Sequence, residues 1–191
     1  MLHQKLDGII LKTSPFKEFD KVIVFFSAND GVVRVIGKGV RRPRSQRSYH
    51  LDLFNVVKVE LECSGRTTPL LYLREITTEE HYKRIKKDPV RYSAASIICL
   101  FVLRMVPEGA RNQHELFELT IQALNALNIS EEIDANKTVI TYLLKAVKLL
   151  GHLENQIKST LLESELLLQL ESLDPQFTLQ ARRTLSIFSS L

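Results

Sequence analysis

The sequence predicts a β + α chain of two domains: an N-terminal five-stranded barrel of the OB-fold type over residues 1–80, then an all-α helical bundle over residues 81–191. Two observations predict this fold class. Residues 1–77 contain β-branched and aromatic runs with strand-like alternation, joined by short turns. From residue 78 onward, apolar positions recur at helical spacing and Pro or Gly separates the segments.

Five strands are expected in the first domain, over residues 6–13, 21–27, 32–40, 51–63 and 70–76. The turn Asn29-Asp30-Gly31 joins the second strand to the third as a hairpin. Gly8 lies early in the first strand, at a point where a sheet can bend or bulge. A sheet with this number of short-linked strands most commonly removes its open edges by closing into an OB-type barrel.

The second domain is expected to contain five helices, over residues 89–105, from Asn112, from Asp134 to Gly151, over 159–171 and over 175–190. Pro89 suits a first helical turn because the N–H it lacks would be unpaired there. Asn112 and Asp134 carry side chains that cap helix N-termini, and Gly151 suits a C-cap. Leucine and valine stripes then predict the buried faces.

The net charge of +4 is unevenly distributed. Residues 1–80 hold 13 basic and 10 acidic side chains, and residues 81–111 hold 7 and 2. Residues 112–191 hold 6 basic and 10 acidic side chains. A positive field over the first 111 residues favours a nucleic-acid face there, and the acidic remainder favours a different role.

The most informative stretch is a basic run that begins in the third strand and continues beyond it. No acid occurs between Asp30 and Asp52, and the run contains six cations: Arg34, Lys38, Arg41, Arg42, Arg44 and Arg47. Gly and Pro interrupt it, which is typical of a loop leaving a sheet edge. Several cations with no accompanying chemistry suit a repeating anion, and nucleic-acid phosphate is the obvious candidate. The alternative is a solvated charge run on a surface loop.

Aromatic side chains accompany these cations, namely Phe16, Phe19, Tyr49 and Phe54. Barrels of this type bind single strands by combining a basic groove with rings on which bases stack. Tyr49 is the best stacking candidate because it lies within the basic loop. Phe25, Phe26 and Phe54 are expected in the core instead.

A second basic cluster follows the barrel and consists of Lys83, Arg84, Lys86, Lys87 and Arg91. If it folds toward the barrel groove, it extends the track of phosphate contacts. The alternative is the solvated start of a helix.

Motifs of enzymatic chemistry are absent from the sequence. The five histidines are scattered, with no HExxH and no His/Cys pair at ligand spacing. There is no GxSxG, and Gly37-Lys38-Gly39 lacks the frame of a phosphate loop. Cys63 and Cys99 are too few and too far apart for a disulfide framework. We expect a protein that is not an enzyme, with no cofactor and no metal, and with two buried free thiols in a reducing cytosol.

The start of the chain and its apolar stretches predict a cytoplasmic protein without membrane contact. The first residues lead into strand-like alternation rather than an apolar signal core. The longest apolar stretch, residues 96–106, is interrupted by Arg104 and is too short to span a bilayer.

Leucines are concentrated over residues 161–170, beyond what one amphipathic helix face needs. One interpretation is a core helix covered on both sides. The other is a groove for an apolar peptide, rimmed by Arg104, Lys145 and Lys148.

Four segments carry a resemblance to a known family: DGIILKT (7–13), FKEFDK (16–21), GKGVRRPRS (37–45) and YLLKAVKLLGHL (142–153). The first three resemble the N-terminal domain of the bacterial recombination mediator family RecO, and residues 37–45 are the most specific part. The fourth is similar to a segment of that family's helical domain.

This resemblance implies an OB-fold and a helical domain that bind single- and double-stranded DNA, anneal complementary strands and work with RecR. Together these proteins help RecA replace single-stranded-DNA-binding protein (SSB) on gapped DNA, in the bacterial nucleoid. The resemblance implies phosphate contacts from Lys38, Arg41, Arg42, Arg44 and Arg47. It also implies that the helical domain takes the acidic, apolar C-terminal tail of SSB.

The sequence departs from the family pattern in one respect. The chain is short for the family, and many members carry a four-cysteine zinc-finger-like insertion after the Gly-His-Leu segment. Residues 154–160 contain no cysteine. We expect a shortened form without the structural metal.

The leading hypothesis is therefore a DNA-binding recombination mediator that neutralises and aligns strands. A second hypothesis is an adaptor that binds SSB or RecR and holds DNA only weakly, which the acidic helical half favours. A third is an RNA-binding OB protein, which a site that reads the 2′-hydroxyl would distinguish.

Overall fold

The computed structural model separates into two compact units, one formed by residues 1–81 with 106–114 and the other by residues 82–105 with 115–191. It describes residues 3–64, 70–129, 134–151, 166 and 170–189. The division after residue 81 lies beside the boundary expected at residue 80. Residues 106–114, which the sequence assigned to the helical domain, belong instead to the barrel unit.

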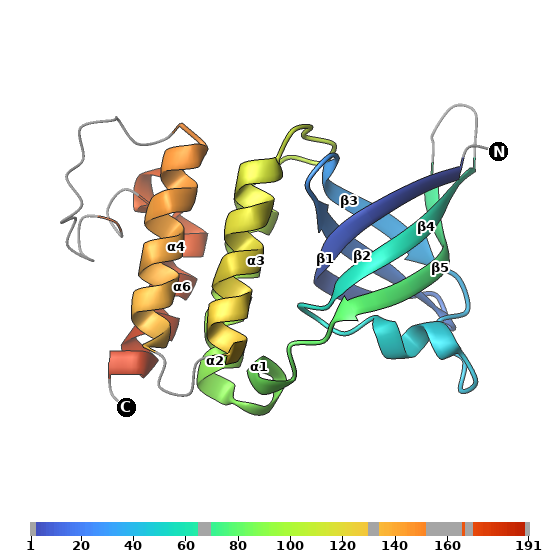
Figure 1. The fold of residues 1–191 in the computed structure, drawn as a ribbon, viewed down its shortest axis with the longest axis horizontal. Coiled ribbons are helices and arrows are strands. Elements are labelled where there is room, and N and C mark those ends of the chain that lie inside the picture. Colours follow the sequence, from blue (N-terminus) through green and yellow to red (C-terminus); the bar gives the residue numbers. More distant parts are fainter. Residues whose placement is uncertain (1–2, 65–69, 130–133, 152–165, 167–169, 190–191) are drawn as a thin grey trace. The chain divides into compact units, whose positions relative to one another are not determined.

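The first unit is a closed barrel of five strands (Figure 1). Its elements are β1 (His3–Phe16), β2 (Asp20–Ser27), β3 (Gly31–Gly37), the 3-10 helix η1 (Gln46–His50), β4 (Val56–Ser64) and β5 (Leu70–Glu80). Neighbouring strands follow the order β1-β2-β3-β5-β4, and β4 pairs with β1 to close the ring. The OB-fold prediction is confirmed.

β1 closes the barrel because it is long enough to pair with two strands. Its residues from His3 to Ile9 pair with β4, and those from Ile9 to Phe16 pair with β2. The register with β2 shifts between Ile10 and Lys12, and this bulge bends the strand from one neighbour to the other. The sequence suggested Gly8 for this irregularity, whereas it lies at Leu11.

Alternate apolar side chains of all five strands fill the barrel, together with two from the β3–β4 connection: Leu6, Ile10, Ile23, Phe25, Val33, Val35, Val40, Leu51, Val57, Val59, Leu61, Leu73 and Ile76. Full burial of one apolar side chain of this size stabilises the folded state by about 1.5–3 kcal/mol. The prediction that Phe25, Phe26 and Phe54 are core residues is confirmed, since none is more than 1% exposed.

Two strand boundaries differ from the sequence prediction. β3 ends at Gly37 rather than Val40, because Gly39 has a φ of +66° and turns the chain out of the sheet. A Cβ on Gly37, the last residue of β3, would lie 2.9 Å from Cδ1 of Ile23, so a larger residue there would require the Ile23 side chain to shift. β4 begins at Val56 rather than residue 51, because Phe54 has a φ of 71° and interrupts the extended backbone.

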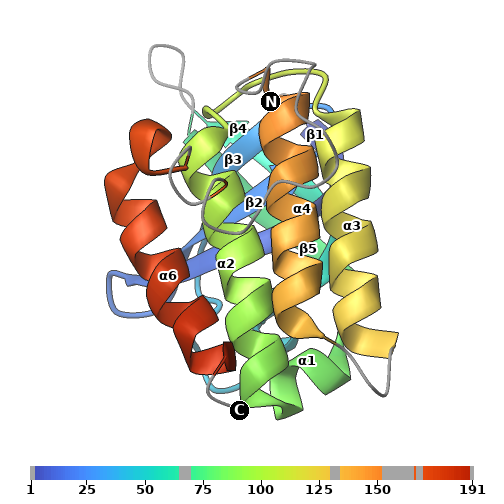
Figure 2. The same ribbon diagram turned by 90° about the vertical axis from the view of Figure 1, so that its left-hand side faces the viewer.

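The second unit is helical (Figure 2). Its helices are α1 (Lys83–Lys87), α2 (Pro89–Met105), α3 (His114–Ile129), α4 (Ala135–Leu149) and α6 (Pro175–Ser189). α2 packs against α1, α4 and α6, so it is the centre of the bundle. The ring of Phe101 on α2 meets Tyr142 of α4 and Phe177 of α6 edge to face, with centroids 6.0 and 5.6 Å apart.

The expected start of α3 is wrong. Asn112 does not cap this helix, since it has a φ of 60° and its backbone N–H donates to the Asn29 carbonyl. The backbone N–H of Gly109 donates to Val32 and that of Gln113 to Ala28, at 3.1 and 2.7 Å. These bonds tie residues 106–114 to the β2–β3 turn, and α3 starts only at His114.

The other helix boundaries agree better with the sequence. α2 covers residues 89–105 as expected, and Asp134 caps α4 by accepting from the Lys137 N–H at 2.9 Å. Gly151 adopts a φ of +74° after the last turn, as its predicted C-cap role requires. The predicted helix over 159–171 falls mostly outside the described residues, and the short α1 was not expected.

The two thiols are free, but only one is buried. Cys99 lies in the helical core, where burial raises the pKa of its thiol to about 12. Cys63, expected to be buried, is half-exposed near the end of β4. No helix in the described part of the chain is long and apolar enough to cross a membrane.

Candidate nucleic-acid interface

The basic loop after β3 is anchored on the β1–β2 turn. The backbone N–H of Gly39 donates to the Asp20 carboxylate at 2.7 Å, and that of Arg41 donates to the Phe19 carbonyl at 2.9 Å. The Arg41 guanidinium also reaches the carbonyls of Lys17 and Glu18, at 3.4 and 3.1 Å. Arg41 therefore holds one side of the loop in place and is not a fully free cation.

Three cations of this region lie over aromatic rings. Lys38 Nζ is 3.9 Å from the centroid of the Tyr72 ring. Arg42 Cζ is 5.4 Å from the Phe19 ring, and Lys17 Nζ is 5.4 Å from the Phe16 ring. Phe16 and Phe19 are 36% and 38% exposed, so their surfaces are available to a ligand. A cation–π contact leaves the N–H donors of the cation free.

Arg44 completes this surface, which we call the basic loop face: Lys17, Lys38, Arg42 and Arg44 with the rings of Phe16, Phe19 and Tyr72. Arg44 is exposed and makes no hydrogen bond or ion pair within the described parts of the chain. None of the other three cations is paired with an acid of a described residue. Lys17 and Tyr72 were not among the predicted site residues, whereas Phe16 and Phe19 were expected near the cations as possible stacking rings.

Besides Arg41, two further predicted phosphate contacts have other partners. Arg34 forms an ion pair with Glu108, which comes from residues 106–114 and neutralises its charge. Arg47 is half-buried and donates to the carbonyls of Lys38, Leu73 and Arg74. Sequence reasoning grouped both with the free cations because neither the returning segment nor these carbonyls can be recognised from the run itself.

Tyr49 is 68% exposed, which suits the stacking role expected of it. Its ring meets His50 and His81 edge to face, with centroids 5.7 and 5.5 Å apart. The Nδ1 atom of His50 lies 2.9 Å from the Thr78 hydroxyl, which fixes that ring. Tyr49 is therefore exposed for stacking, and its ring packs against the rings of His50 and His81.

The second basic cluster contains two structural arginines. Arg91 is only 9% exposed, and its guanidinium contacts the Asp88 carboxylate at 3.1 Å and the Leu127 carbonyl at 2.6 Å. Arg84 donates to the carbonyl of Ile129 at 2.8 Å. Lys83 and Lys87 are exposed and Lys86 is half-buried. Lys83 and Lys87 are therefore the lysines of this cluster that the described structure leaves on the surface.

The pKa of the Asp88 carboxyl is set by its burial and by its hydrogen bonds with Arg91 and Val90. Burial acts to raise its pKa, but hydrogen bonds from the backbone and guanidinium of Arg91 and from the Val90 N–H outweigh it, so the pKa is lowered.

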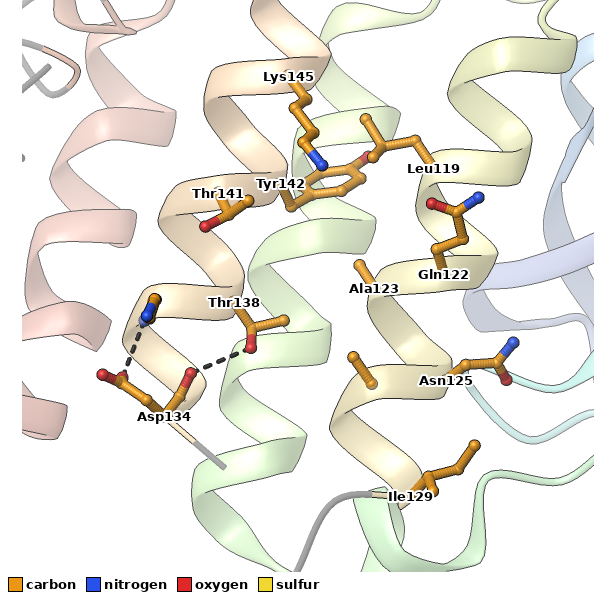
Figure 3. A pocket seen from close by; sticks show the side chains of 12 residues that line it. Leu119, Gln122, Ala123, Asn125, Ile129, Asp134, Thr138, Thr141, Tyr142 and Lys145 are labelled. Atoms are coloured by element: carbon orange, nitrogen blue, oxygen red, sulfur yellow. Dashed lines mark hydrogen bonds between the residues drawn. The ribbon is translucent and has the colours of Figure 1, made fainter. Parts of the chain in front are cut away.

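The helical unit contains a groove of about 760 Å³ between α3 and α4 (Figure 3). Apolar and small side chains of Leu119, Ala123 and Ala126 line one wall. Thr138, Thr141 and Tyr142 line the other, and the Tyr142 hydroxyl lies 3.1 Å from that of Thr120. Lys137 and Lys145 lie at the rim, whereas the carboxylate of Asp134 is occupied as the α4 cap.

The predicted partner-binding cations lie in different places. Lys145 lines this groove, while Lys148 is exposed but does not line it. Arg104 instead joins α2 to the start of α6, with Nε 3.8 Å from the Asp174 carboxylate and Nη2 3.3 Å from the Gln176 side chain. The leucine-rich segment is described only at Leu166 and Leu170, which are both buried. Among the described residues, no group of His, Cys, Asp and Glu could hold a metal ion.

The fold and this surface define an OB-fold protein with a cationic, ring-lined loop between its third and fourth strands. Family comparison agrees: residues 1–82 match the model described as Recombination protein O N terminal, and residues 86–153 match Recombination protein O C terminal. The chain belongs to the RecO family.

Several members of this family are similar to the chain. The DNA repair protein RecO of Symbiobacterium thermophilum is 32% identical over 108 residues, which are 56% of this chain and 42% of the relative. That of Syntrophobacter fumaroxidans is 27% identical over 149 residues, 78% of this chain and 57% of the relative. That of Bifidobacterium animalis subsp. lactis is 29% identical over 145 residues, 76% and 59%. The chain thus matches about half the length of these relatives.

Proposed function

We propose that this protein binds single-stranded DNA on the basic loop face and promotes the pairing of complementary strands, as a recombination mediator that makes and breaks no bonds. The observation that supports it is the basic loop face itself, where Lys17, Lys38, Arg42 and Arg44 are exposed without acidic partners among the described residues. No cofactor or metal is required for this role.

The physical basis is charge neutralisation combined with stacking. Each phosphate contact releases condensed counterions and adds about 0.7 to the slope of log affinity against log salt for a single strand. Stacking of a base on an aromatic side chain contributes about 1–3 kcal/mol. Two strands held on one cationic surface repel each other less, so annealing accelerates without a chemical step.

The test is fluorescence anisotropy of a labelled single-stranded oligomer at 50 and 200 mM salt, followed by an annealing assay with the complementary strand. We expect salt-sensitive binding and faster annealing than in buffer. Absence of binding at 50 mM salt would reject the DNA-binding role. Preference for an RNA oligomer of the same sequence would favour the RNA-binding alternative.

The groove between α3 and α4 supports a second function, the capture of an acidic, apolar peptide. Its walls are largely apolar, and the rim cations Lys137 and Lys145 outnumber free rim carboxylates among the described residues. The C-terminal tail of SSB has this chemistry, and its capture would place the protein on SSB-coated DNA, where RecR and RecA act.

A peptide with the sequence of the SSB tail tests this second function. We expect Lys145→Glu to weaken peptide binding at least tenfold. Lys148→Glu is the matched control, since Lys148 is on the same helix but outside the groove. Equal losses in both variants would show a diffuse charge effect and reject the groove.

A further inference from the structure

Among the described residues, the seam between β3 and β5 has fewer paired residues than any other contact between neighbouring strands of the barrel. Among the described residues, these two parallel strands share a single bridge, Ile36–Tyr72. Close by, β5 carries an extra residue, because Glu60 pairs with Glu75 while Leu61 pairs with Leu73. Arg74 is therefore a bulge, and a bulge disrupts the ladder around it.

The side chain of Arg47 joins the parts that meet at this seam. Its Nη1 donates to the carbonyls of Leu73 and Arg74 at 3.0 and 3.3 Å, on the bulge of β5. Its Nη2 donates to the Lys38 carbonyl at 2.8 Å, directly after β3. The Arg47 guanidinium thus connects η1, β5 and the start of the basic loop. Its hydrogen bonds add to the single backbone pair between β3 and β5.

We propose that Arg47 is a positioning residue for DNA binding: it holds the basic loop face in its binding conformation and does not itself contact phosphate. This inference rests on the proposed function. Three of the five N–H donors of its guanidinium already donate to backbone carbonyls, so a phosphate that took these donors would detach the loop from β5. The carbonyl that accepts from Arg47 Nη2 belongs to Lys38, which is itself a cation of the face.

The geometry explains why arginine is needed. A guanidinium offers donors in a rigid planar fork, whereas the lysine ammonium is a compact point charge on a flexible stem. Lysine at position 47 would keep the charge but lacks the planar fork with which Arg47 bonds carbonyls on β5 and after β3 together. A phosphate contact, in contrast, tolerates lysine because the charge is what matters there.

Arg44 is the matched control in the same loop. It lies three positions before Arg47 and is exposed, with no hydrogen bond or ion pair to a described residue. Arg44→Ala removes one free cation and leaves the seam intact.

The experiment compares wild type, Arg44→Ala, Arg47→Lys and Arg47→Ala by hydrogen exchange of residues 38–50 and by single-stranded DNA binding at several salt concentrations. For Arg44→Ala, we expect unchanged exchange and a salt slope lowered by about 0.7. For Arg47→Lys, we expect faster exchange of the loop and about tenfold weaker binding, since the competent loop conformation falls to about a tenth. Its salt slope stays at the wild-type value because Arg47 makes no phosphate contact that the substitution could remove.

Two results would overturn the proposal: wild-type affinity and loop protection in Arg47→Lys, or a lowered slope with unchanged protection in Arg47→Ala. If Arg47→Ala does not fold, nitrogen NMR of the guanidinium groups in the wild-type protein tests the proposal instead. If the Nη groups of Arg47 rotate slowly and their signals do not shift when DNA is added, the positioning role is supported. If their signals shift together with those of Arg44, that role is rejected. The exchange measurement needs no DNA. If the wild type fails to bind DNA, the proposed function is rejected, but hydrogen exchange still tests whether Arg47 holds the loop on β5.

Discussion

Two basic segments of this chain are alike in sequence and differ in structure. The loop after β3 and the segment 83–91 both concentrate Lys and Arg within a few residues. In the loop, Lys38, Arg42 and Arg44 are exposed and form no ion pair with an acid of a described residue. In the second segment, Arg84 and Arg91 donate to carbonyls at the end of α3. Cation density alone therefore does not indicate how many charges a ligand can reach.

The difference arises from what lies next to each segment. The last four carbonyls of a helix have no partner within it and carry the negative end of its dipole. The C-terminal turn of α3 presents such carbonyls, at Leu127 and Ile129, to the arginines of the second segment. In the loop, Arg41 donates to the carbonyls of Lys17 and Glu18, and Arg47 donates to carbonyls at the β5 bulge.

The largest expected effect concerns the stability of the helical unit. Arg91→Ala removes the guanidinium that bonds both the Leu127 carbonyl and the Asp88 carboxylate, so we expect the free energy of unfolding to fall by about 3 kcal/mol. Urea denaturation followed by circular dichroism measures this. Lys87→Ala, an exposed cation of the same segment, should change stability by no more than about 0.5 kcal/mol. Similar values for both variants would contradict the distinction between structural and exposed cations.

A pair of double variants compares the two segments as DNA-binding surfaces. Arg42→Ala with Arg44→Ala removes two cations of the basic loop face, so we expect the salt slope for a single strand to fall by about 1.4. Lys83→Ala with Lys87→Ala removes two exposed cations of the second segment and should leave the slope unchanged. Anisotropy titrations at several salt concentrations measure both. An equal loss in the second pair would show that both segments contact DNA.

Tyr49 tests the stacking contribution, which is smaller. Tyr49→Ala should weaken binding to a single-stranded oligomer by about 1 kcal/mol, whereas Tyr49→Phe, which keeps the ring, should bind like wild type. Binding to a duplex, whose bases are already stacked, should be the same in all three proteins. A loss in the duplex as well would point to a backbone contact instead.

The smallest expected effect is a dependence of stability on pH. Because the folded pKa of Asp88 lies below its ordinary value of 3.8, its ionised form stabilises the fold above that pH. This stabilisation is lost as pH falls through the lowered folded pKa. Urea denaturation between pH 2 and 5 should show a shallower decline in Asp88→Asn than in wild type. An identical decline would assign acid sensitivity to other carboxylates.

Much of the fold was predictable because local signals agree with tertiary packing. The five strands follow from alternating β-branched and aromatic residues, and α2 begins and ends at Pro89 and Met105 as expected. The start of α3 was not predictable, because residues 106–114 pair with the β2–β3 turn, far away in sequence. Asn112 has the chemistry of a cap but lies in a backbone conformation set by that contact.

The candidate site was predictable in location and only partly in membership. Cations and rings of the loop are visible as a run, and Tyr49 is exposed as expected. Lys17 and Tyr72 join the surface only because the β1–β2 turn and β5 lie beside the loop in the barrel. Arg34, Arg47 and Arg91 leave it because acids or carbonyls distant in sequence occupy their donors.

Composition and periodicity were thus enough to establish a five-stranded barrel, a helical region and a basic loop, because burial patterns and turn chemistry are local properties of the chain. Which cations face solvent and which bind the fold depended on the arrangement in three dimensions. A guanidinium is held wherever an unpaired carbonyl or carboxylate comes within hydrogen-bonding distance, and that proximity arises from chain segments that meet only when the protein folds.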